Sequence, residues 1–310
     1  MSGLRREAVR VMVPASSANL GPGFDSAGLA LAIYDDLIAM VTDDAGVLVE
    51  VDGEGAGVVP LDESNLVARS MVAAFAAMDV RVPGFILRCV NVIPHGRGLG
   101  SSAAAIIGGI VLARAMVSDG RERMTDSDVL QLALAQECHP DNLAAALHGG
   151  FTVAWLEGEG FADAVRMEPH ADVLPVVLVP PDALSTSQAR ALLPDSVAFA
   201  DASANVARAA LLVHAMTSDP RRLMTATEDR LHQQRRASAY PDSVALVARL
   251  RDAGVPAVIS GAGPTVLAFA SSSVTSVTSV IADAAGEGWI VQAVPVAPVG
   301  AREVPMPPLP

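Results

Sequence analysis

Lysine is absent from this chain of 310 residues, and all 21 of its basic residues are arginines. Phosphate-loop NTPases, protein kinases and pyridoxal phosphate enzymes each depend on one particular lysine, which binds phosphate or forms a Schiff base. The sequence therefore excludes these three classes of protein.

Cysteine is scarce, since Cys89 and Cys138 are the only two. Two distant cysteines make neither a disulfide framework nor a C-x-x-C site, and they suit a reducing compartment. The first ten residues lack the apolar run of a signal peptide. The longest apolar run, 101–117, is interrupted by Arg114 and is short for a membrane span. We therefore expect a cytoplasmic protein that does not enter a membrane.

Positive charge is also in deficit, which leaves a formal net charge of −13 and a pI of about 4.8. A surface this acidic repels phosphate backbones, so we expect no nucleic-acid partner. An anionic ligand must instead be bound by a local cluster of donors. Aromatic residues make up only 4% of the chain against 51% hydrophobic residues. The core must therefore consist mainly of Ala, Val, Leu and Ile.

Hydrophobic periodicity predicts an α+β protein, and the length suggests two domains. Strands are expected over 9–14, 37–41, 47–51, 85–93, 151–156, 174–179, 257–260, 265–270 and 289–294. Helices are expected from an N-cap at Ser64 to Met78, from Ser101 onward, from a cap at Asp126 or Ser127 to Glu137, and over 142–147, 202–216, 221–237, 243–253 and 273–285. The pattern changes after Pro180-Pro181, which places a domain boundary between 156 and 180.

The strongest local signal is a glycine-rich segment between a predicted strand and a predicted helix, Pro94–Ala105, which reads P-H-G-R-G-L-G-S-S-A-A-A. Glycine lets the backbone turn tightly and approach a ligand closely. The free N–H groups and the dipole of the following helix favour an anion such as phosphate. Hydroxyls of Ser101 and Ser102 can bind phosphate or reach Mg²⁺. Taken alone, the segment is equally compatible with a simple turn.

Two further loops concentrate polar groups beside predicted strands. The first is Pro14–Asp25, P-A-S-S-A-N-L-G-P-G-F-D, in which Asn19 can donate and accept hydrogen bonds and Asp25 can bind an ammonium or hydroxyl group. The second is Ile259–Thr265, I-S-G-A-G-P-T, whose backbone N–H groups can form an anion-binding nest. Most such loops are merely turns, so neither is specific by itself.

In this order and at these separations, the three motifs resemble those of the GHMP kinases, named for galactokinase and the homoserine, mevalonate and phosphomevalonate kinases. The resemblance extends from Val9 to Phe269. It implies a two-domain α+β fold, with a ribosomal-protein-S5-like ATP domain over 1–165 and a ferredoxin-like domain over 166–303. The proline-rich segment 304–310 is expected to be a loose tail.

Four stretches resemble the homoserine kinases within that family. They are Pro14–Leu31, Glu137–Gly150 (E-C-H-P-D-N-L-A-A-A-L-H-G-G), Ser185–Pro194 (S-T-S-Q-A-R-A-L-L-P) and Asp229–Arg236 (D-R-L-H-Q-Q-R-R). The chain departs from the family pattern at three positions, with Cys138 in place of Gly, Ala145 in place of Pro and Arg235 where Tyr is frequent. A side chain at 138, beside a metal ligand, can alter the local loop geometry.

The resemblance assigns roles in a site for a small zwitterion. Arg190 and Arg236 match the residues that hold the substrate carboxylate, and a guanidinium fork suits that task. Solvated surface arginines are the alternative. The amine and hydroxyl end of the amino acid is assigned to Asn19, Asp25, His139 and Asp141. A structural role remains an alternative for His139.

The resemblance also assigns the residues that bind ATP, its phosphates and the metal ion. ATP is expected to contact Pro94, His95, Gly96, Arg97, Gly98, Leu99, Gly100, Ser101, Ser102 and Ala103. A phosphate and substrate loop comprises Ser260, Gly261, Ala262 and Gly263. Glu137 and Ser102 match the residues that hold Mg²⁺, which prefers oxygen ligands and keeps several waters.

The implied reaction moves the γ-phosphoryl group of MgATP to the hydroxyl of L-homoserine. Asn142 stands where related kinases place a catalytic aspartate, and an amide cannot accept the proton. Phosphoryl transfer depends mainly on positioning and charge stabilisation, with Asp25 or Asp141 orienting the hydroxyl. Two alternatives stay open, a GHMP kinase for mevalonate, a sugar or shikimate, and a non-catalytic binding protein of this fold. The sequence is compatible with a homodimer.

Overall fold

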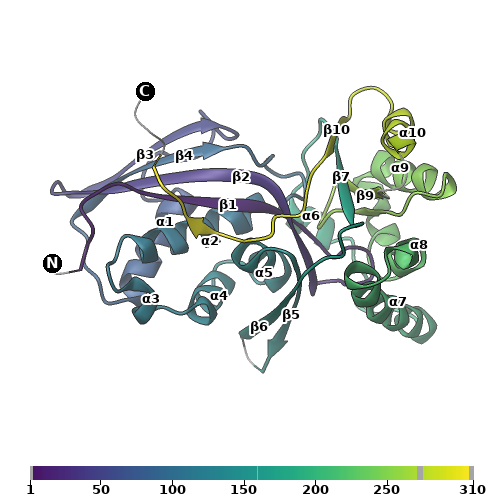
Figure 1. The fold of residues 1–310 in the computed structure, drawn as a ribbon, viewed down its shortest axis with the longest axis horizontal. Coiled ribbons are helices and arrows are strands. Elements are labelled where there is room, and N and C mark those ends of the chain that lie inside the picture. Colours follow the sequence, from purple (N-terminus) through teal and green to yellow (C-terminus); the bar gives the residue numbers. More distant parts are fainter. Residues whose placement is uncertain (1–2, 159, 271–274, 307–310) are drawn as a thin grey trace.

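The computed structural model describes residues 3–158, 160–270 and 275–306, and it divides them between two lobes that are each built on a β-sheet (Figure 1). The N-terminal lobe carries a seven-stranded sheet and the second lobe a four-stranded one. No helix in the described ranges has the length and apolar character needed to cross a bilayer.

The large sheet is mainly antiparallel. Its strands are β1 (Val9–Ala18), β2 (Ala27–Thr42), β3 (Gly46–Gly53), β4 (Gly84–Asn91), β5 (Phe151–Glu157), β6 (Phe161–Met167) and β11 (Arg302–Glu303). Their order is β11-β1-β2-β4-β3, with β5 paired to the start of β2 and to β6. Only the neighbours β3 and β4 are parallel among these pairs. Alternate residues of β1, such as Val9, Val11 and Val13, are buried in the core.

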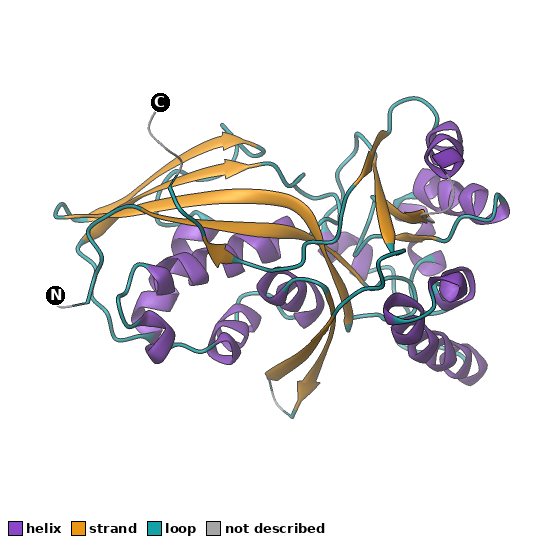
Figure 2. Cartoon of the chain, viewed as in Figure 1, coloured by secondary structure: helices purple, strands orange, loops and turns teal. Residues whose placement is uncertain are grey.

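Helices cover one face of this sheet (Figure 2). They are α1 (Leu66–Ala77), α2 (Ser101–Ala115), α3 (Gly120–Arg123), α4 (Asp126–Leu134) and α5 (Pro140–His148). Helix α2 is buried on almost all sides, which its run of Ala, Ile, Gly and Val permits. The N-cap residues predicted for α1 and α4 are each wrong by one residue or more. The side chain of Asn65, not Ser64, caps α1, and Thr125 forms a capping box with Asp128 at the start of α4.

The second lobe packs helices on an antiparallel sheet. Its strands β7 (Leu174–Val179), β8 (Ala257–Ile259), β9 (Val266–Ala270) and β10 (Ile290–Ala293) follow the order β10-β7-β9-β8. Its helical segments are α6 (Thr186–Arg190), α7 (Phe199–Thr217), η1 (Pro220–Arg222), α8 (Leu223–Ala226), η2 (Gln234–Ala239), α9 (Pro241–Asp252) and α10 (Thr275–Ala285). The predicted helix over 273–285 begins at two residues that lie outside the described ranges.

The prediction of one helix over 221–237 is wrong. The Asp229 carboxylate accepts hydrogen bonds from the N–H groups of Leu231, His232 and Gln233, at 2.9, 3.1 and 2.8 Å. A side-chain acceptor that captures these N–H groups competes with helical bonding. The chain therefore turns after α8 and restarts as η2, which carries Arg236.

The sequence pattern did not predict several elements, among them the first half of β2, the outer strand β6 and the short helix α6. Strand β6 spans the predicted division at residue 165, and β11 returns the chain to the large sheet by pairing with β1. The division into 1–165 and 166–303 stays a prediction. In the predicted tail, Val304 N–H donates to the carbonyl of Arg10, whereas residues 307–310 lie outside the described part.

Candidate active site

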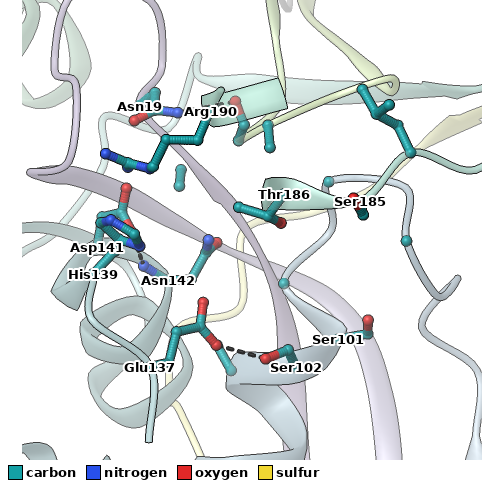
Figure 3. A pocket seen from close by; sticks show the side chains of 18 of the residues that line it. Asn19, Ser101, Ser102, Glu137, His139, Asp141, Asn142, Ser185, Thr186 and Arg190 are labelled. Carbon is teal, nitrogen blue, oxygen red and sulfur yellow. Dashed lines mark hydrogen bonds between the residues drawn. The ribbon is translucent and has the colours of Figure 1, made fainter. Parts of the chain in front are cut away.

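The three glycine-rich motifs meet at one cavity of about 150 Å³ between the lobes. Figure 3 shows Arg190 of α6 facing His139 and Asp141 across this cavity, with Ser102 and Glu137 at its other end. The predicted site residues that line it are Asn19, Asp25, Gly96, Gly98, Gly100, Ser101, Ser102, Ala103, Glu137, His139, Asp141, Asn142, Arg190, Arg236, Gly261 and Ala262. Pro94, His95, Arg97, Leu99, Ser260 and Gly263 are not among its lining residues.

The segment before α2 presents a helix N-terminus to the cavity. Gly100 has φ 70° and immediately precedes α2, whose first residues Ser101 and Ser102 line the cavity. No side chain caps this helix start, so its first N–H groups are available to an anion. A Cβ atom at Gly100 would collide with Ser16 Oγ. The glycine is thus required by the protein's own packing and by its positive φ.

Arg97 fixes this loop to the second lobe. Its guanidinium donates to the carbonyl oxygens of Pro180 and Pro181, at 3.1 and 2.6 Å, and to that of His95 at 3.3 Å. The backbone of Leu184 donates to the carbonyl of Gly96 at 2.8 Å. The Arg97 side chain is therefore an anchor between this loop and the second lobe.

Ser102 and Glu137 form a close pair of oxygen donors. Ser102 Oγ donates to Glu137 Oε2 at 2.6 Å, as the dashed line in Figure 3 marks. Burial raises the pKa of Glu137, and the bond from Ser102 opposes that rise. A carboxylate desolvated in this way gains from a nearby cation. In the described ranges, no group of three or more His, Cys, Asp or Glu could hold a metal by itself. A cation at this pair therefore needs further oxygen ligands, such as phosphates and water.

The loop after β1 is held in an unusual backbone conformation. Asn19, Leu20 and Asp25 all have positive φ, at 69°, 48° and 55°. The amide of Asn19 donates to the carbonyl of Gly261 at 2.9 Å and accepts from the N–H of Asp25 at 2.9 Å. Both ends of this amide are thus engaged with backbone. The bonds show Asn19 joining the Pro14–Asp25 loop to the 260–263 loop.

The 260–263 loop closes onto both other motifs. Ser260 Oγ lies 2.8 Å from Ser17 Oγ and 2.6 Å from the carbonyl of Gly98. The N–H of Gly261 donates to the carbonyl of Ala18 at 3.0 Å. The predicted phosphate and substrate loop therefore supplies structural bonds through Ser260, while Gly261 and Ala262 line the cavity.

Two arginines bring unused hydrogen-bond donors to the cavity. Arg236 has 1% of its surface exposed, and its Nε and Nη1 atoms have no hydrogen-bond partner among the described residues. The buried Nε of Arg190 likewise has none in this part of the chain. Arg190 Nη2 lies 2.6 Å from Asp25 Oδ1. Burial lowers the pKa of Arg236, and the charge of Arg190 adds to that effect. Such desolvated donors favour an anion with two acceptor oxygens.

Arg235 points elsewhere, although it adjoins Arg236 in sequence. Its Nη2 lies 3.5 Å from Asp201 Oδ2 of α7, and it does not line the cavity. The structure thus distinguishes the two arginines, and only Arg236 reaches the site.

Helix α5 brings the remaining polar side chains. His139 directly precedes α5, and burial lowers the pKa of its imidazole. Burial raises the pKa of Asp141 to about 7, reinforced by the charges of Asp25 and Glu137. The backbone N–H of Asn142 donates to Asp141 Oδ1 at 2.7 Å. Helix α5 therefore brings two polar groups to the cavity. One is the carboxyl group of Asp141, which can be protonated or anionic near neutral pH, and the other is the side-chain amide of Asn142.

The sequence patterns missed some lining residues and a second cavity. Leu184, Ser185 and Thr186 complete the first cavity, and Ser185 also caps α6. The second cavity, of about 350 Å³, adjoins Ser101 and Ser102 and is lined by Val13, Asp35, Leu37, Val59, Pro60, Ser64, Asn65, Leu66, Val67, Cys89, Asn91, His95, Ala104 and Ala105. Its walls come from five separate segments. No local motif marks such a surface.

Known proteins are similar to this chain in sequence and in fold. The family models for the GHMP kinases N terminal domain and the GHMP kinases C terminal match residues 65–150 and 210–283. The chain is 52% identical to the homoserine kinase of Streptomyces avermitilis, over 97% of both chains. It is 51% identical to that of Streptomyces coelicolor, over 97% of this chain and 96% of the relative.

The fold comparison agrees with the sequence comparison. The crystal structure of the homoserine kinase of Cytophaga hutchinsonii has a TM-score of 0.83 and 25% identity, over 98% of this chain and 99% of that one. The chain therefore belongs to the GHMP kinase family, and within that family to the homoserine kinases. The predicted family and the two-domain α+β fold are confirmed.

Proposed function

We propose that this protein transfers the γ-phosphoryl group of MgATP to the side-chain hydroxyl of L-homoserine, which gives O-phospho-L-homoserine for threonine biosynthesis. The observation that carries the proposal is the pair Arg190 and Arg236, two cavity-lining arginines with buried donors that have no partner among the described residues, beside an uncapped helix N-terminus. One cavity thus offers a carboxylate site and a phosphate site.

The charges of the cavity match a small amino acid. The substrate carboxylate would bind Arg190 and Arg236, and its ammonium would lie near Asp25 and Asp141. The hydroxyl would then point toward Asn142 and the start of α2. The cavity volume of about 150 Å³ suits a molecule of this size. Mevalonate, a sugar or shikimate lacks the ammonium and would bring no positive charge to Asp25 and Asp141.

ATP would extend from the first cavity into the second. Its phosphates would meet the N–H groups at Gly100–Ser102, and its adenosine would occupy the apolar cavity beside α2. Mg²⁺ would be held by Glu137, Ser102 and the phosphates, where it would neutralise charge on the transferring group. The oxygen-only donor set of Ser102 and Glu137 fits this ion.

Catalysis would rest mainly on positioning and charge stabilisation, as is general for phosphoryl transfer. Asn142 has no proton-accepting function, and burial lowers the pKa of His139. Asp141 accepts a hydrogen bond from the backbone N–H of Asn142 and would orient the substrate. Arg190 and Arg236 would fix the carboxylate, so that Asn142 and the α2 terminus hold the hydroxyl in line with the γ-phosphoryl group.

A substrate panel tests the proposal. With MgATP, ADP release should be faster with L-homoserine than with mevalonate, galactose or shikimate by well over tenfold in kcat/KM, roughly the discrimination expected when buried polar groups are left unpaired. Equal turnover of another acceptor would favour a different GHMP kinase. ATP binding without turnover of any acceptor would favour a binding protein. A cytoplasmic location and a homodimer also remain proposals.

A further inference from the structure

The aromatic ring of Phe24 lies beside the two arginines that line the cavity, Arg190 and Arg236. The guanidinium carbons of Arg190 and Arg236 are 5.2 and 5.3 Å from its centroid. The imidazole of His232 is 5.0 Å away, with an angle of 31° between the ring planes. Three side chains from the second lobe thus surround one residue of the Pro14–Asp25 loop.

The two arginine side chains need a neighbour that stabilises their positive charges. Arg236 is almost fully buried and forms no ion pair with any described residue, while Arg190 has one at Asp25. Like charges packed beside each other in a poorly solvated site repel. A carboxylate in place of the ring would relieve the repulsion but would occupy the donors that the substrate needs. An aromatic face attracts a guanidinium and leaves its N–H groups free.

The surroundings hold the ring in place. His232 is buried, and its Nε2 lies 2.8 Å from the carbonyl of Gly21, in the same loop as Phe24. Its backbone N–H is bound by Asp229, the residue that interrupts the helix before η2. The stretch 229–236 therefore supplies both Arg236 and the imidazole that stacks on Phe24.

We propose that Phe24 is a positioning residue whose aromatic face holds Arg190 and Arg236 ready for the substrate carboxylate. This inference rests on the proposed function, since it assumes a carboxylate ligand. It predicts that the electron-rich face of the ring matters, beyond its apolar bulk. Because Phe24 acts through the arginines, its loss should raise KM for the amino acid and leave KM for ATP unchanged.

The experiment compares Phe24→Leu with Phe24→Tyr and with 3,4,5-trifluorophenylalanine at position 24. Leucine removes the ring, tyrosine keeps it, and fluorine withdraws electron density while nearly preserving its shape. Phe75→Leu is the matched control, because Phe75 is buried in the N-terminal core beside Phe85, at 6.2 Å between ring centroids. Each variant is assayed with L-homoserine and with 3-amino-1-propanol, which has the amine and the hydroxyl but no carboxylate.

Wild-type turnover of L-homoserine is measured first, and its absence would refute the proposed function itself. Given that turnover, Phe24→Leu should raise the homoserine KM by roughly 5- to 30-fold, the range for one to two cation–π contacts. The fluorinated variant should shift KM in the same direction, and Phe24→Tyr and Phe75→Leu should stay near wild type. The 3-amino-1-propanol kinetics should not change.

Two results would overturn the inference. The first is an unchanged homoserine KM in the fluorinated variant, which would remain decisive if Phe24→Leu failed to fold. The second is an equal loss with both acceptors, which would mean that Phe24 only maintains the loop.

Discussion

Ser16 Oγ of β1 donates a 2.9 Å hydrogen bond to Asn142 Oδ1 at the start of α5. The bond orients the amide, so the Nδ2 group of Asn142 is left to face the cavity. Asn142 can then donate to the acceptor hydroxyl oxygen or to the γ-phosphoryl group, without acting as a base. The buried Ser16 thereby orients the side-chain amide of Asn142, which lies 126 positions away in the sequence.

Ser16→Ala should therefore lower kcat while the substrates still bind. Loss of one hydrogen bond of this kind is worth about 1 kcal/mol, or about fivefold in rate. Steady-state kinetics for homoserine and ATP measure the effect. Ser70→Ala is the control, since Ser70 is a buried serine of α1 that lines neither cavity and bonds the carbonyl of Leu66 and the side chain of Gln136. Equal kinetics for both alanine variants would contradict the orienting role.

Asp141 should make substrate capture depend on pH. Burial raises its pKa to about 7, so the carboxyl group is neutral below that pH and anionic above it. Only the anion attracts the ammonium of the amino acid. We expect kcat/KM for homoserine to rise with pH and to level off above about 7, since this parameter reports groups of the free enzyme.

The pH profile of Asp141→Asn separates this residue from His139, whose pKa is lowered by burial. The variant should have a low kcat/KM without the inflection near neutral pH. An inflection that persists in Asp141→Asn would assign the titration to another group.

Arg236→Lys should bind homoserine poorly although it keeps a positive charge. An ammonium cannot reproduce the two parallel bonds of a guanidinium to a carboxylate. Loss of one charge-assisted bond costs about 1.5–3 kcal/mol, or about 10- to 150-fold in KM. Arg235→Lys is the matched control, because Arg235 pairs with Asp201 outside the cavity. If Arg235→Lys is the defective variant, the assignment of the two arginines is reversed.

Ser102→Ala and Glu137→Gln should separate metal placement from nucleotide binding. The pair is joined at 2.6 Å, and its proposed ion acts on charge that develops during transfer. We expect kcat to fall by about tenfold or more. Titration calorimetry of ATP with and without Mg²⁺ is the second readout. Glu137→Gln should lose much of the magnesium-dependent gain in ATP affinity, and an unchanged gain would remove Glu137 from the metal site.

The sequence predicted the parts of this molecule that depend on local pattern. The strand, glycine loop and small-residue helix around Pro94–Ala105 lie where periodicity indicated. Most of the residues that the family motifs assigned to the site line one cavity, but Pro94, His95, Arg97, Leu99, Ser260 and Gly263 do not. The sequence pattern did not predict the details that depend on specific side-chain hydrogen bonds in the folded chain. The Arg97 side chain bonds two proline carbonyls more than 80 residues away, at |i−j| of 83 and 84. The helix break at Asp229 depends on side-chain capture of backbone N–H groups, which an apolar pattern does not encode.

Turnover of MgATP with L-homoserine, followed by ³¹P NMR, tests the central claim most directly. Purified protein should consume ATP in step with homoserine and give ADP and one phosphate monoester in equal amounts. The product signal should coincide with added O-phospho-L-homoserine, and Arg236→Lys should slow its appearance. ATP loss to inorganic phosphate alone, or no loss of ATP with homoserine while another alcohol is phosphorylated, would contradict the account.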